Sequence, residues 1–100
     1  ASFASDDLEV DLARRMVLVE GTETYLTPTE YDVLRTLIQH AGKVVTHRQL
    51  LRLVWGPAYV NETHLLRVNV STLRRKIEKD PAKPRHVITE PGVGYRLKVV

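Results

Sequence analysis

Arginine and hydroxyl side chains recur at helical spacing in the second half of the chain. From about residue 63 to 79, apolar residues follow one another at intervals of three or four: Leu66, Val70, Leu73 and Ile77. This spacing predicts a helix with one buried stripe. At about 100° per residue, the opposite side carries polar and basic side chains and one valine: His64, Val68, Ser71, Thr72, Arg75 and Lys79. Arg67 and Arg74 lie on one flank of that face.

Such a face could donate hydrogen bonds to a polyanion such as DNA. Guanidinium and hydroxyl groups bind phosphates or base edges, and a helix fits the major groove. Val68 would be an exposed apolar residue there, and contact with a thymine methyl group would account for it. A scattered surface valine explains it equally well. The basic run Arg74–Lys76 also has a plain explanation, because cations favour the C-terminal end of any helix.

Residue patterns typical of catalysis do not occur in the chain. The four histidines form no His-Glu-x-x-His pair or other zinc-binding spacing: His40, His47, His64 and His86. No Gly-x-Ser-x-Gly, phosphate-binding loop or dinucleotide fingerprint is present. The glycine-rich segment 91–94 precedes no helix, and a hairpin turn explains it. We therefore expect no enzyme activity, no metal and no cofactor.

Charge is divided unevenly along the 100 residues. Residues 1–30 carry seven acids and two bases, a net charge of −5, whereas residues 31–100 carry thirteen bases and five acids, a net charge of +8. This asymmetry favours a polyanionic partner for the C-terminal part, although a solvated basic surface would look the same. The length fits one domain over residues 1–100, and the hydrophobic content of 43% excludes a disordered chain. Without cysteines or an apolar run of about 20 residues, we expect neither disulfides nor a membrane span.

Start and stop signals predict three helices. Thr27–Glu30 supplies a capping box with proline at the first helical position, and Gly42 is the expected end. Thr46 and Gln49 supply a second capping box, and the second helix is expected to end at Gly56–Pro57. The third helix is expected to begin near 61–63 and to stop at Asp80–Pro81.

Strands are expected on both sides of the helices. Leu8, Val10 and Leu12 alternate with acidic residues, Met16–Val19 is rich in β-formers, and Tyr25–Leu26 could close a small meander. Near the C-terminus, residues 87–89 and 95–100 predict a hairpin with one apolar and one basic face. The predicted class is α+β, with the second and third helices and the hairpin in the order of a winged helix-turn-helix.

Five segments in order resemble the winged-helix effector domain of OmpR/PhoB-type response regulators along essentially the whole chain. They are Leu26–Tyr31, Gly42–Leu51, Val54–Gly56, Leu73–Ile77 and Gly92–Arg96. Residues 55–57 and 78–86 look closest to the potassium-responsive Kdp subgroup. The resemblance implies an N-terminal four-stranded antiparallel sheet, three helices and a C-terminal β-hairpin wing at about 86–99. It also implies sequence-specific binding of double-stranded DNA, with the helix at about 63–79 in the major groove.

By position, the resemblance assigns site residues. Contacts to bases or nearby phosphates fall to the recognition helix: His64, Arg67, Val68, Ser71, Thr72 and Arg75. Contacts to the DNA backbone, or their support, fall to four others: Trp55, Arg74, Thr89 and Tyr95. A loop that can contact RNA polymerase corresponds to five residues: Gly56, Pro57, Ala58, Tyr59 and Val60.

The resemblance further implies a cytoplasmic transcription factor of a two-component system. Its expected partners are tandem direct repeats of DNA bound by a homodimer, RNA polymerase, and a sensor histidine kinase that phosphorylates a missing N-terminal receiver domain. Two departures matter: Pro91 replaces a wing arginine that enters the minor groove in some members, and Thr72 replaces a common arginine of the recognition helix. A winged-helix module that binds protein instead of DNA is the alternative, and the lack of aromatic anchors on the basic face speaks against it.

Overall fold

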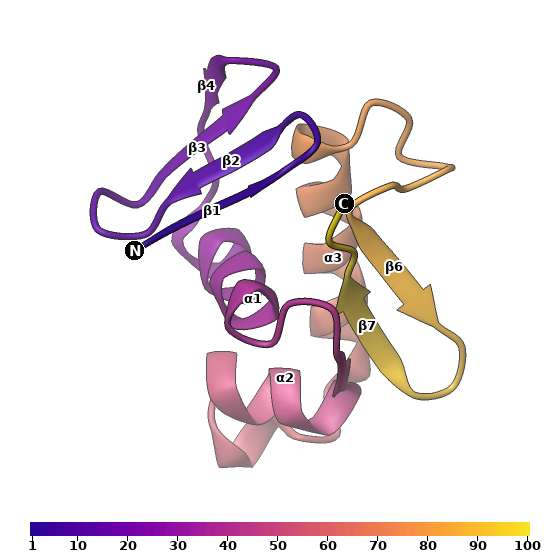
Figure 1. Cartoon of the computed structure of the whole chain (residues 1–100). Helices are drawn as coiled ribbons and strands as arrows, with labels where there is room; N and C mark the ends of the chain where they lie inside the picture. The colour runs from indigo at the N-terminus through magenta and orange to yellow at the C-terminus, as the bar shows by residue number, and fades with distance from the viewer.

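The computed structural model describes residues 1–100, and its N-terminal part is a four-stranded antiparallel sheet (Figure 1). The strands lie in chain order: β1 (Ser2–Ser5), β2 (Leu8–Asp11), β3 (Met16–Val19) and β4 (Thr22–Thr24). The alternation predicted after residue 7 is confirmed, because Leu8 and Val10 are buried and Glu9 is exposed. The four-stranded sheet that the resemblance implied is also confirmed.

Two details of this sheet differ from the strands that the sequence predicted. β1 carries no clear apolar alternation, yet it pairs with β2 as an edge strand. The meander closes with β4 and not with Tyr25–Leu26, which follow it. The reason is the tight turn at Glu20 and Gly21, whose φ angles of +50° and +78° reverse the chain at once. β4 therefore pairs with β3 immediately after the turn.

Helices α1 (Pro28–Gln39) and α2 (His47–Val54) begin where their capping boxes predicted. In α1 the Thr27 hydroxyl accepts from the backbone N–H of Glu30, and the Glu30 carboxylate accepts from that of Thr27. The Thr46 and Gln49 pair does the same for α2. Helix α1 ends at Gln39, and a turn formed by His40, Ala41 and the predicted stop Gly42 leads to strand β5 (Val44–Thr46).

Helix α3 (Thr63–Ile77) follows a short 3-10 turn, η1 (Pro57–Tyr59). Its predicted stripe is confirmed, since all four apolar residues are at most 1% exposed: Leu66, Val70, Leu73 and Ile77. The helix ends two residues before the predicted Lys79. Glu78 takes an extended conformation, and its carboxylate accepts backbone N–H groups of residues 85–87. Lys79 therefore lies outside the helix and not on its outer face.

A C-terminal hairpin completes the winged-helix architecture (Figure 1). Strands β6 (Val87–Glu90) and β7 (Gly94–Leu97) pair antiparallel, as predicted. β5 adds a third strand beside β7, which the sequence pattern did not indicate. In Figure 1 the hairpin lies beside α3, and α1 lies between the N-terminal sheet and α2. None of the three helices has the length and apolar composition needed to cross a membrane.

Candidate nucleic-acid interface

The outer face of α3 is open to solvent and slightly hollowed. The six residues that were predicted on the recognition helix line this one hollow: His64, Arg67, Val68, Ser71, Thr72 and Arg75. All are exposed except Thr72, which is half-buried. Val68 is 45% exposed to solvent. The amphipathic pattern therefore predicted the direction of this face correctly. We call this set the α3 face.

The two arginines of the α3 face have no acidic partner. Arg67 and Arg75 form no ion pair, whereas five other arginines of the chain do so: Arg14, Arg15, Arg35, Arg85 and Arg96. A guanidinium without an acidic neighbour offers its donors to an incoming anion. No carboxylate lines the hollow. The arrangement suits a polyanion with hydrogen-bond acceptors.

A second hollow lies between α3 and the hairpin. Eight residues line it, and three of them are arginines: Arg67, Val70, Ser71, Arg74, Arg75, Pro81, Ala82 and Tyr95. Arg67, Ser71 and Arg75 belong to both hollows. Because they are spaced by four residues, they form one ridge along the helix. This ridge forms the edge of the α3 face and borders the groove beside the wing.

Arg74 joins the helix to the wing. Its Nε and Nη2 donate to the carbonyl oxygen of Val87 at 3.1 and 2.8 Å, and Nη2 also donates to the Thr89 hydroxyl at 2.8 Å. Its guanidinium carbon lies 5.6 Å from the ring centre of Tyr95. Three of the four predicted backbone-contact residues are thus brought together, and Arg74 is held rigidly by the protein. Nη1 makes no hydrogen bond and remains free.

Tyr95 and Trp55 are both packed. Tyr95 is 6% exposed, and its ring meets the His47 ring edge to face at 5.6 Å between centroids. Trp55 is half-buried against the core and lines neither hollow. The structure therefore does not bring Trp55 to the Arg74 cluster. The loop that follows it is exposed at Pro57, Ala58 and Tyr59, while Gly56 and Val60 are partly covered.

Glu30 holds helix α3 from its buried side, a role that the sequence did not indicate. It is 3% exposed, and its Oε1 accepts a 2.6 Å hydrogen bond from Lys76 Nζ on α3. Burial raises the pKa of Glu30, but hydrogen bonds from Lys76, Thr72 and the Thr27 backbone outweigh burial and hold that pKa below its ordinary value. In the sequence, the capping box alone accounted for a glutamate at position 30. No local signal pairs residues 46 positions apart.

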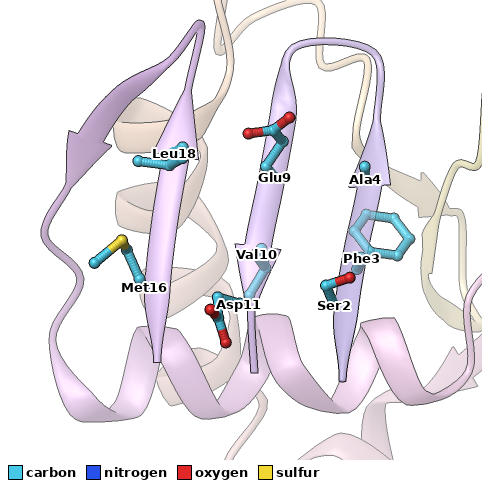
Figure 2. A pocket seen from close by; sticks show the side chains of 8 residues that line it. All are labelled: Ser2, Phe3, Ala4, Glu9, Val10, Asp11, Met16 and Leu18. Atoms are coloured by element: carbon cyan, nitrogen blue, oxygen red, sulfur yellow. The ribbon is translucent and has the colours of Figure 1, made fainter. Parts of the chain in front are cut away.

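The outer face of the N-terminal sheet holds another hollow of different chemistry. Figure 2 shows its lining, with Ala4, Glu9 and Leu18 side by side on three strands, as the pairing register requires. Its only charged residues are Glu9 and Asp11. Carboxylates repel phosphate, and no basic residue lines this hollow, so this surface does not compete with the α3 face for nucleic acid.

A family model and known proteins match this chain. The model described as "Transcriptional regulatory protein, C terminal" matches residues 21–97. The KdpE transcriptional regulatory protein of Mycobacterium tuberculosis is 50% identical over 94% of the chain and 42% of its own length. The KDP operon regulator KdpE of Escherichia coli is 52% identical over 91% of the chain and 40% of its own length.

A solved structure supports the same architecture. The DNA-binding domain of Klebsiella pneumoniae RstA, crystallised in complex with the RstA box, superposes with a TM-score of 0.87 at 26% identity. The match covers 97% of this chain and 96% of the RstA chain. The chain spans about two fifths of the length of the two KdpE relatives.

Proposed function

Because this chain belongs to the family of transcriptional regulatory protein C-terminal domains, the effector domains of OmpR/PhoB-type response regulators, we propose that it binds specific double-stranded DNA and regulates transcription. The observation that carries the proposal is the α3 face, a hydrogen-bonding helical surface whose arginines have no acidic partner. A helix of this kind fits the major groove, where base edges differ in their donor and acceptor patterns.

The residues of the α3 face then meet base edges and the phosphates beside them. With α3 in the major groove and the wing towards the minor groove, one DNA strand runs between them. The groove lined by Arg67, Ser71 and Arg75 on the wing side of α3 lies on that path. Arg74 supports this backbone contact together with Thr89 and Tyr95, and the Trp55 indole N–H contributes from a separate position.

The test is a salt series of duplex binding with the 100-residue chain. Fluorescence anisotropy with a random duplex should give an affinity that falls steeply with salt, because phosphate contacts release counterions. Selection from a randomised pool should then yield a defined sequence motif. Absence of duplex binding at low salt would reject the proposal and favour the protein-binding alternative.

The parts of the regulator outside this chain belong to the proposal as well. A receiver domain, preceding this domain and phosphorylated by a sensor histidine kinase, would set its activity, and two copies would bind tandem direct repeats in the cytoplasm. The support is the KdpE similarity, which extends over two fifths of those relatives. Repeats recovered by selection, with a fixed spacing of about one helical turn, would support the paired arrangement.

The loop Gly56–Val60 is the proposed contact to RNA polymerase. Tyr59 is 44% exposed, and Leu53 near the end of α2 is 52% exposed, so apolar surface is available there. Neither residue lines the α3 face. Tyr59→Ala should therefore lower transcription from a bound promoter while leaving duplex affinity intact, and an equal loss of both would reject this role.

A further inference from the structure

The Thr72 hydroxyl is directed into the protein although Thr72 lines the α3 face. It donates a 3.1 Å hydrogen bond to the carbonyl oxygen of Asn69, one turn earlier on α3. This acceptor belongs to the protein, and a hydroxyl has one proton to donate. The hydroxyl therefore has no proton left to donate to a ligand in the hollow, whereas the methyl group, Cγ2, has no partner that holds it.

Val68 lies one helical turn before Thr72. Residues at this spacing are neighbours on a helix surface, so the two valine methyl groups and Thr72 Cγ2 form one apolar patch. Val68 leaves 45% of its surface in water. The hollow that contains the patch is lined otherwise by polar and basic residues: His64, Arg67, Ser71 and Arg75. An apolar patch inside a cationic face fits a ligand that is anionic at its edges and apolar at one point.

We propose that Val68 and Thr72 together read the 5-methyl group of thymine in the major groove. The inference rests on the proposed function, because it requires α3 in that groove. Among the four bases only thymine presents a methyl group there. The surrounding cations would hold the phosphates and the polar base edges. Thr72 would thus be a specificity-determining residue that acts through its methyl group and not through a hydrogen bond.

Direct hydrogen bonding from Thr72 to a base is the competing explanation. Donation to a base would require the hydroxyl proton to leave the carbonyl oxygen of Asn69, which would give up an existing partner. The two explanations predict opposite results when the methyl and the hydroxyl of residue 72 are removed separately.

The experiment begins with a duplex selected from a randomised pool by the 100-residue chain. Each thymine is then replaced singly by deoxyuridine, which removes only the 5-methyl group. The readout is the ratio of the two dissociation constants, uracil duplex over thymine duplex. At one thymine or two adjacent thymines we expect a ratio of about four, the fold-change for burial of one methyl group.

Variants of the chain show which side chains cause that ratio of dissociation constants. Thr72→Ser keeps the hydroxyl and loses the methyl group, and Val68→Ala removes the other half of the patch; both should bring the ratio towards one. Thr72→Val loses the hydroxyl and keeps the methyl group, and it should preserve the ratio. Thr22→Ser removes a methyl group from an exposed threonine of strand β4 that lines neither hollow, so it is the matched control and should also preserve the ratio.

Three outcomes would overturn the inference. Ratios near one at every thymine of a tightly bound duplex would reject methyl readout while leaving DNA binding intact. Loss of the ratio in Thr72→Val, with retention in Thr72→Ser, would assign recognition to the hydroxyl. Failure to select any duplex would contradict the proposed function itself, and the inference with it.

Discussion

Lys76 on α3 donates a 2.6 Å hydrogen bond to the same Glu30 oxygen that accepts the backbone N–H of Thr27. One buried carboxylate therefore closes the capping box of α1 and fixes α3 against it. Glu30 is almost fully buried, whereas the Lys76 side chain keeps 36% of its surface. The helix that carries the α3 face is thus held in place by a buried carboxylate that does not line that face.

Glu30→Gln should destabilise the fold by about 1–3 kcal/mol at neutral pH, because it removes a hydrogen-bonded buried charge. The folded-state pKa of Glu30 lies below its ordinary value of 4.5. Its stabilising contribution is therefore complete above pH 4.5 and is lost as the pH falls through the lowered folded value. Urea unfolding of both chains at several pH values measures this difference.

The control for that experiment is Glu23→Gln on strand β4, an exposed site at which no ion pair is formed. It should change the unfolding free energy little at any pH. A gap between the unmodified chain and Glu30→Gln that widens on acidification would contradict the role assigned to the carboxylate.

Arg74→Lys should loosen the wing even though the charge is kept. An ammonium group cannot reproduce the forked contact that Arg74 makes with Val87 and Thr89. We expect a loss of about 1–2 kcal/mol in stability and faster hydrogen exchange in β6 and β7. Exchange rates equal to those of the unmodified chain would show that Arg74 does not position the wing.

Gly94→Ala should unfold or severely weaken the domain. A Cβ at this position would overlap the carbonyl oxygen of Val45 in the neighbouring strand, so β5 would have to separate from β7. We expect a cost of about 3 kcal/mol or more. Gly92→Ala is the comparison: its surroundings are open and only its φ of +73° is strained, so about 1 kcal/mol is expected. Thermal melts that rank the two variants the other way would contradict the close strand packing.

Arg75→Ala should weaken binding to the selected duplex and to random duplex alike. Neutralising a phosphate is independent of sequence, so the slope of log affinity against log salt should fall by about one. Arg14→Ala, an exposed arginine in the turn before β3, should leave the slope unchanged. An unchanged slope for Arg75→Ala would remove Arg75 from the phosphate contacts.

The parts of the fold that the sequence predicted are those with local signals. Capping boxes located the starts of α1 and α2, and the stripe from Leu66 to Ile77 located the buried side of α3. Because a helix has a fixed period, knowing the buried side also places the exposed one. The open positions of His64, Arg67, Val68, Ser71 and Arg75 follow from this geometry.

What the sequence could not predict depends on contacts between distant residues. β5 is a strand only because β7 lies beside it, and α3 stops early only because Glu78 binds the backbone of residues 85–87. Thr72 lies on the open face by angle, yet its hydroxyl donates to the carbonyl oxygen of Asn69 on the same helix. Tertiary partners of this kind leave no periodic signal in the chain.

The most direct test of the central claim is an NMR titration of the ¹⁵N-labelled chain with a short selected duplex. The largest amide shifts should fall along α3 from His64 to Arg75 and on the facing side of the wing, with the N-terminal sheet almost unchanged. Shifts concentrated on β1–β4, with α3 unaffected, would contradict the assignment of α3 as the DNA-reading helix.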